Sequence, residues 1–337
     1  MKFSQISYTR KRNRSILLAL SALVLTTAVL SICIGSVPVP PGHVAEALFG
    51  TSSDPAVLAI VRYSRLPRTC AALLAGAALA ASGAVIQILL HNPLASPGVI
   101  GVNSSAGFAV AVICALFPAA QIHTPVIAMA GALLGAMLIS LLSRISGASR
   151  TTVILSGIAI SNLFSAGIDA AVTLVPEALT GVSDFRIGGF TGVTLDKLLI
   201  PAVIIGISLL LILSVTRQLD ILSLGSDVAA GLGLPVSLFR GLILIPGAAL
   251  AGAAVSFSGL IGFVGLIVPH IMRKLLGEES LPMLMGCILG GGSFVLLCDI
   301  LSRVVFAPFE IPVGITLSFL GCPFFLWLLF SRKGGRK

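Results

Sequence analysis

Long apolar segments with almost no charged residues recur along this chain, and most of them are long enough to cross a lipid bilayer. A helix needs about 20 mostly apolar residues to span the hydrocarbon core. Only 10% of the residues are charged, whereas a soluble domain carries about 25%. The sequence therefore predicts an all-α, polytopic membrane protein with about ten transmembrane helices. The ten candidate segments are residues 16–36, 66–90, 98–118, 124–143, 151–172, 197–215, 237–256, 259–269, 281–303 and 312–331.

The basic residues predict how these segments are oriented. Arg10, Lys11, Arg12 and Arg14 precede the first segment, which is longer than the apolar core of a secretory signal peptide. With a cytoplasmic N-terminus and ten crossings, fifteen Lys and Arg residues fall on the cytoplasmic side and six on the outer side. This asymmetry follows the positive-inside rule. We predict one transmembrane domain over 1–337 in the cytoplasmic (inner) cell membrane, with a basic cytoplasmic tail at 1–15 and a cytoplasmic C-terminus.

The segments lack the groups that would power transport or catalysis. Ion-coupled transporters carry ionisable residues deep in the membrane, whereas Asp169 and Asp299 fall towards the ends of their segments. Asp299 also precedes Arg303 by one helical turn, so the two can pair locally. No P-loop pattern occurs, and the dispersed His and Cys residues predict neither a metal site nor an enzyme. Basic residues are scattered singly, so we expect no nucleic-acid partner. The chain is predicted to carry solute but to take its energy from another chain.

Mild polar residues within the segments have two interpretations. Gln87, Asn103, Ser104 and Asn162 can hydrogen-bond between helices, or they can line a passage for the solute. Both interpretations stay open from the sequence.

Two places are predicted to break the helical pattern. The eighth segment, 259–269, is too short to cross alone, and we expect a half-helix packed inside protein that ends in a turn at Pro269-His270. The stretch from Asn92 to Asn103 holds two prolines and two glycines, which predicts a loop or re-entrant segment rather than a continuous helix.

Four stretches of sequence carry a family resemblance. They are RLPRT at 65–69 with GAALAASG at 76–83 and NPLASPGVIGVN at 92–103; LG at 224–225 with AAGLGLP at 229–235; GFVGLIVPHIMR at 262–273; and DILSR at 299–303 with EIPVG at 310–314 and LGCPFF at 320–325. In this order and spacing they resemble the FecCD family, the permease subunits of importers for iron-siderophores, haem and cobalamin. The resemblance runs from the second apolar segment to the C-terminus.

The resemblance implies the fold and the partners. It implies the type II permease fold of ABC importers and ATP-driven import of an iron-siderophore or a similar chelate; haem, cobalamin and oxyanions are alternatives within the family. It also implies a second permease subunit, identical or different, an external solute-binding protein, and cytoplasmic ATPase subunits that bind the ATP and Mg. An ion-coupled secondary transporter and a membrane-embedded enzyme or scaffold are the alternatives outside the family.

The resemblance also implies roles for particular residues. Arg65, Arg68 and Arg303 match positions that dock the binding protein; the alternatives are anchoring at lipid headgroups or, for Arg303, pairing with Asp299. Residues 219–235 match the segment that couples to the ATPase, and Thr151 and Thr152 match a cytoplasmic gate. Within the coupling segment the expected contacts are Leu224, Gly225, Asp227, Ala230, Gly231, Leu232 and Gly233.

Overall fold

A computed structural model describes residues 2–52, 54–98, 101–117, 124–145 and 150–331, and this part of the chain is helical without a strand. Each of the ten predicted segments contains a helix: α1 (Lys2–Cys33), α4 (Leu66–Leu90), α5 (Val102–Leu116), α6 (Thr124–Ile145), α7 (Arg150–Leu174), α9 (Leu195–Ser214), α12 (Val236–Ser258), α13 (Val264–Leu276), α14 (Ser280–Val304) and α15 (Val313–Ser331). Short helices connect them: α2 (Pro41–Phe49), α3 (Pro55–Ala59), a π-helical turn (Ile60–Arg65), a 3-10 turn (Pro176–Ala178), α8 (Leu179–Ile187), α10 (Thr216–Ser223) and α11 (Ser226–Gly231).

Six stretches of helix are long and apolar enough to cross a membrane by themselves, and they lie in α1, α3–α4, α7, α9, α12 and α14. Helices α5, α6 and α15 contribute shorter apolar stretches of 10–17 residues. The predicted all-α membrane fold is confirmed.

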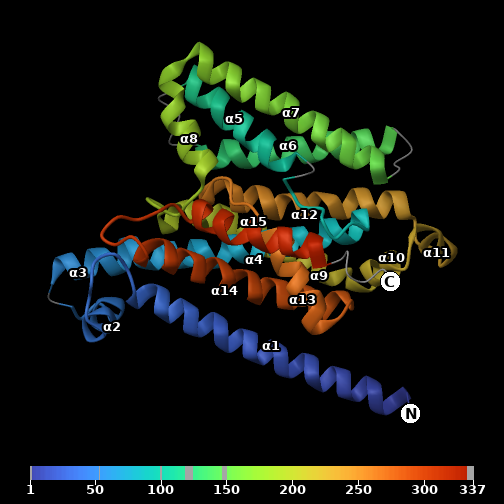
Figure 1. Ribbon diagram of the computed structural model, residues 1–337, viewed down its shortest axis with the longest axis horizontal. Coiled ribbons are helices and arrows are strands. Elements are labelled where there is room, and N and C mark those ends of the chain that lie inside the picture. Colours follow the sequence, from blue (N-terminus) through green and yellow to red (C-terminus); the bar gives the residue numbers. More distant parts are fainter. Residues whose placement is uncertain (1, 53, 99–100, 118–123, 146–149, 332–337) are drawn as a thin grey trace.

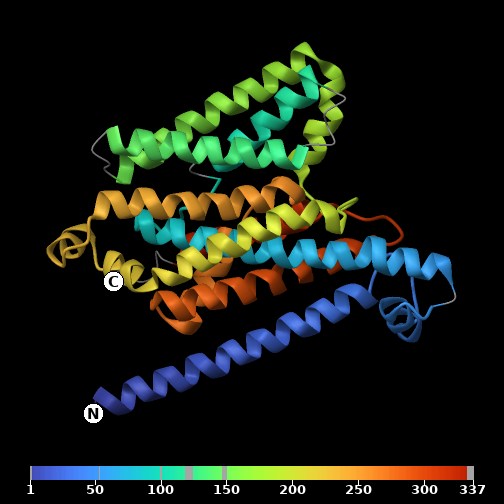
Figure 2. The same cartoon turned by 180° about the vertical axis from the view of Figure 1, so that it is seen from behind.

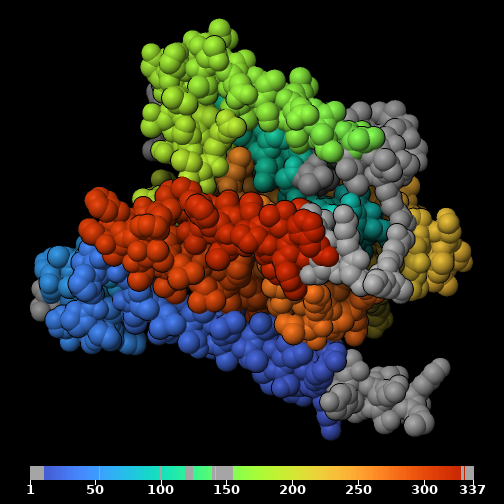
Figure 3. Space-filling model, in the orientation of Figure 1, coloured from blue at the N-terminus to red at the C-terminus, as the bar shows by residue number. Residues whose placement is uncertain are grey.

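The long helices lie roughly along the long axis of the molecule, so that the bundle has two distinct ends (Figures 1 and 2). Helices α2 and α3 lie at one end, and α10 and α11 lie at the opposite end together with the start of α1. We call these the α2–α3 end and the α10–α11 end. Helices α5 to α8 form a layer on one side of α12, and α1 packs on α14 on the other side. Helix α15 lies exposed between α7–α8 and α14 on the face in Figure 3.

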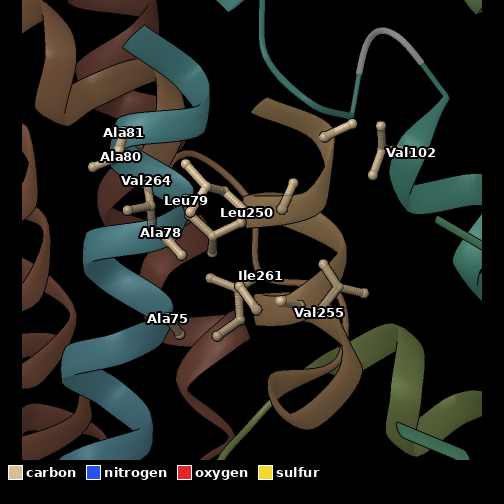
Figure 4. Close-up of a cluster of buried hydrophobic side chains, with 14 of the residues drawn as sticks. Ala75, Ala78, Leu79, Ala80, Ala81, Val102, Leu250, Val255, Ile261 and Val264 are labelled. Carbon is tan, nitrogen blue, oxygen red and sulfur yellow. The ribbon is translucent and has the colours of Figure 1, made fainter. Parts of the chain in front are cut away.

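Small residues form the centre of the bundle. Helix α4 brings Ala75, Ala78 and Leu79 against Leu250 of α12 and Val264 of α13, all buried (Figure 4). Helix α4 also approaches its neighbours through glycine: a Cβ atom on Gly76 would collide with the backbone of Gly291 in α14, and one on Gly83 would collide with the carbonyl of Gly265 in α13. Close backbone packing through glycine is typical of membrane helices, where contact rather than water exclusion drives association.

The predicted half-helix is present, but its end differs from the expectation. Residues 259–263 are not helical, and α13 then runs for 13 residues to Leu276. The expected turn at Pro269-His270 is wrong, because Pro269 lies inside the helix. A proline lacks the N–H that would bond four residues back, to the carbonyl of Gly265. The Nε2 atom of Gln87 donates to that oxygen at 3.1 Å, so a neighbouring helix satisfies the carbonyl that proline leaves unpaired.

Candidate functional site

A buried cluster of charged side chains lies at the α2–α3 end. Asp299 of α14 is 0% exposed and pairs with two arginines: Arg68 of α4, whose Nε lies 2.9 Å from Oδ1, and Arg303, whose Nη2 lies 3.0 Å from Oδ2. The Arg303 guanidinium also donates to the backbone carbonyls of Ser31 and Ile34 at 3.0 and 2.9 Å. The cluster therefore joins α1, α4 and α14.

Two further residues extend the cluster to the loops around it. The Arg65 guanidinium donates to the carbonyls of Ile32 and Cys33, the last two residues of α1, at 2.9 and 2.7 Å, and to the carbonyl of Val37 in the loop that follows. Glu310, in the loop between α14 and α15, accepts hydrogen bonds from Arg68 and from the hydroxyl of Ser36. Three buried cations thus face two carboxylates and several carbonyl oxygens, all within one chain.

These contacts show what the three arginines bind in the free chain. Arg65, Arg68 and Arg303 do lie together at one end of the bundle, but each is buried and bonds to groups of its own chain. The predicted alternative of an Arg303–Asp299 pair is present. A docking partner would reach these guanidinium groups only by displacing such contacts, so their role in the free chain is structural.

Opposing effects act on the carboxyl group of Glu310. Burial alone would raise its pKa, but the hydrogen bonds from Ser36 and Arg68 and the charges of Arg68 and Arg303 outweigh it and hold the pKa below its ordinary value of 4.5. Glu310 thus stabilises the folded chain only while it is ionised.

We expect the Glu310→Gln variant to be less stable than the wild type at neutral pH, by about 1 kcal/mol or less because the side chain is partly exposed. A folded-state pKa below that of the unfolded chain gives stability above the unfolded value and loses it as the pH falls through the folded value. Melting temperatures of the purified proteins should therefore converge as the pH drops below about 4. An offset that stays constant with pH would contradict this assignment.

The predicted coupling segment forms a protruding surface at the α10–α11 end. It folds as α10, α11 and the turn to α12, and its apolar residues Leu224 and Leu232 are 64% and 62% exposed. Val228 is exposed beside them, whereas Ala229 is buried. Asp227, Ala230, Gly231 and Gly233 are exposed as well, and Gly225 is half-buried.

The base of this segment is fixed to the bundle, while its tip is not covered by any of the described residues. Asp220 of α10 accepts a hydrogen bond from the backbone N–H of Ser280, at the start of α14, at 2.7 Å. Arg240 of α12 donates to the hydroxyl of Ser226 at 2.8 Å. Gly225 and Gly233 have φ angles of +115° and +85°, which favour glycine and set the two sharp turns around α11. Force applied to the tip would therefore reach α12 and α14.

The candidate passage residues separate into different environments. Gln87 is buried and bonds between helices, to Gly265 and to Arg273, which is the first of its two predicted interpretations. Ser104 bonds to Gly101 within its own turn, and Asn103 is half-buried in the first turn of α5. Asn162 is exposed on α7, so it stays a candidate for lining a passage. Thr151 and Thr152 lie in the first turn of α7, where their side chains fall outside the described residues.

Several contacts of the charged cluster could not be found from the sequence. Arg68 and Asp299 are 231 residues apart, and Arg68 and Glu310 are 242 apart.

A second feature that the sequence did not reveal is a shallow apolar recess of about 530 Å³ between α8 and α15, which is lined by Ile187, Ile315 and Phe319 among others. Its only signal in the sequence is the aromatic content of the last segment.

Comparison with known proteins gives matches over nearly the whole chain. The model of the FecCD transport family matches residues 23–331. The Fe(3+)-citrate import system permease protein YfmE of Bacillus subtilis is 36% identical over 326 residues, which cover 95% of this chain and 97% of that protein. The vitamin B12 import system permease protein BtuC of Salmonella typhi is 36% identical over 331 residues, covering 96% and 97%. A solved metal-chelate type ABC transporter, in an inward-facing conformation, matches with a TM-score of 0.83 and 31% identity over 94% of this chain and 99% of that chain.

Proposed function

The chain belongs to the FecCD transport family, and on that premise we propose that it carries an iron chelate into the cell. It is the multi-pass membrane permease subunit of an ABC importer and is not itself an enzyme. The choice of cargo is supported by two of the matched proteins together, the ferric citrate permease and the solved transporter of metal-chelate type. Cobalamin is the second candidate, because the vitamin B12 permease is equally similar.

The importer is completed by other chains in this proposal. A second permease subunit forms the passage together with this one, and an external binding protein delivers the chelate at the α2–α3 end. ATPase subunits bind ATP and Mg at the α10–α11 end, which is then cytoplasmic together with both chain termini. The exposed apolar helices support a further subunit: Phe319, Leu326 and Trp327 of α15 are all exposed on one helix.

The α10–α11 surface supports coupling to the ATPase. Exposed apolar residues at the tip suit burial in a partner's cleft, and the hydrogen bonds at the base link the tip to α12 and α14. Movement of the ATPase would therefore be passed to helices that contact the centre of the bundle.

Docking of the binding protein at Arg65, Arg68 and Arg303 requires an exchange of partners. A carboxylate on the binding protein would have to replace Asp299 or Glu310 on Arg68, Asp299 on Arg303, and backbone carbonyls on Arg65. Arginine suits such an exchange because its fork binds either carboxylate in two parallel contacts.

Transport of alternative cargoes tests the proposal. The complex is purified through a tag on this chain together with its ATPase and binding protein, and reconstituted into vesicles. We expect ATP-dependent uptake of radiolabelled ferric citrate or a ferric hydroxamate, and no uptake of labelled cobalamin. Accumulation of cobalamin without ferric chelate would assign the chain to the second cargo instead.

A further inference from the structure

A basic pocket opens at the α10–α11 end, where α4, α10, α13 and the start of α14 meet. Its volume is about 470 Å³, within the range of small-molecule sites. The titratable residues that line it are His91, His270, Arg273, Lys274 and Glu278, and the polar ones are Gln87, Asn92 and Ser223. The pocket is thus lined by two permanent cations and one carboxylate.

The chain holds Arg273 in place at this pocket. Gln87 is only 2% exposed, and its Oε1 accepts from Nη2 of Arg273 at 3.1 Å while its Nε2 donates to the carbonyl of Gly265. Since both ends of the amide are used, the side chain cannot rotate freely. A buried glutamine that fixes a guanidinium in a pocket is typical of a built binding site, in which the charged contact is preorganised.

The second cation is placed differently. The ammonium of Lys274 lies over the ring of Trp327, 5.2 Å from its centre. Neither Lys274 nor Glu278 makes an ion pair with another described residue. A cation–π contact at an exposed site is weak, about 0.5–1 kcal/mol, so an anion in the pocket can draw Lys274 away from the ring.

The wall next to α4 is shaped by an unusual backbone turn. His91 ends α4 with a φ of 45°, a conformation that non-glycine residues seldom adopt. The turn continues through Asn92, whose side chain accepts from the backbone N–H of Leu94 at 3.0 Å. This turn directs the chain away from the helix axis and leaves the space that the pocket occupies.

We propose that this pocket binds a small multivalent anion through carboxylate or phosphate groups, with Arg273 and Lys274 as its charged contacts. The guanidinium fork matches such groups in two parallel contacts. This site is separate from passage of the cargo. It adjoins α10, which leads to the coupling segment, so an anion bound there would lie next to the surface proposed to contact the ATPase. A soluble anion and a phospholipid headgroup share this chemistry.

Binding is tested on the full-length chain in nanodiscs of phosphatidylcholine alone. Citrate and inorganic phosphate are titrated at constant ionic strength, with sodium chloride as the balancing salt. Trp327 is the single tryptophan of the chain, so its fluorescence reports departure of Lys274 from the ring. We expect a saturable change with citrate or phosphate that chloride does not produce. A response that is linear, or equal for chloride, would overturn the proposal.

Variants identify the contacts by calorimetry, which does not depend on the tryptophan. Arg273→Gln and Lys274→Gln should each weaken anion affinity about tenfold or more, the effect of losing one charge-assisted contact. Glu278→Gln should bind as tightly or more tightly, because it removes the opposing charge. Lys197→Gln, which changes an exposed lysine at the start of α9 away from this pocket, is the matched control and should bind as the wild type does. Unchanged affinity in the Lys274→Gln variant, whose side chain is exposed and not needed for folding, would contradict the assignment.

Nanodiscs that contain phosphatidylglycerol separate the two sources of the anion. If the lipid headgroup is the ligand, these nanodiscs produce the fluorescence change without citrate and reduce citrate affinity. If the ligand is soluble, citrate affinity is the same in both membranes. Either result supports an anion site, and neither requires transport or the partner subunits. Failure here is therefore distinguishable from failure of the proposed function.

Discussion

Replacing Asp299 with alanine is expected to lower the stability of the permease by about 3 kcal/mol or more, enough to deplete the folded protein in the membrane. Asp299 is fully buried between Arg68 and Arg303. Its removal leaves two buried cations with one carboxylate, Glu310. Deleting one partner of a buried ion pair lowers the free energy of unfolding by more than the intact pair contributes to it, because the other charge stays buried without its partner. The measurement is thermal unfolding of the purified chain, with yield in the membrane fraction as a second readout.

Asp169 provides the matched control. It lies 3.6 Å from Arg186, but its side chain is 70% exposed and the arginine is 55% exposed. Exposed ion pairs contribute little, so Asp169→Ala should melt as the wild type does. Equal melting temperatures for both variants would show that the cluster at the α2–α3 end does not hold α1, α4 and α14 together.

Replacing Gly231 with phenylalanine is expected to lower the rate of ATP-driven uptake by about tenfold or more, while the permease itself folds normally. A Cβ on Gly231 meets no atom within 4 Å, and no positive φ is required there. The large side chain therefore fits the free chain but would hold the tip of the coupling segment away from a partner. The readouts are uptake and ATPase activity of the reconstituted complex, and uptake should fall while ATP hydrolysis continues or the ATPase dissociates.

Gly206 of α9 is the control for this change. A Cβ there also meets no atom within 4 Å, but the residue lies within a long apolar helix distant from the coupling segment. Gly206→Phe should transport at the wild-type rate. Full transport by the Gly231→Phe variant would exclude the α10–α11 tip as the contact for the ATPase.

The membrane fold could be predicted because its signal is local. The length of an apolar segment and the lack of charges within it decide whether a helix can cross lipid, and every predicted segment contains a helix. Pro269 misled the prediction of where α13 ends. Its effect depends on whether another helix satisfies the freed carbonyl, and Gln87 does so from 178 residues away in sequence.

The contacts of the charged cluster could be predicted from the sequence only in part. Charge counting indicated which end of the bundle Arg65 and Arg68 occupy, but it carried no information on whether they face solvent or a buried carboxylate. The Arg303–Asp299 pair was predictable because the residues are one turn apart. The contacts of Arg68 with Asp299 and Glu310 depend on tertiary packing of α4 against α14, which no local pattern specifies.

We propose that this chain provides the passage and that a separate ATPase drives transport through the α10–α11 surface. Uptake of ferric citrate into vesicles with ATP on the side of the ATPase, measured with and without that subunit and in the absence of any ion gradient, tests this most directly. We predict uptake only when both the ATPase and ATP are present. Uptake by the permease chain alone that follows a proton or sodium gradient would contradict the account.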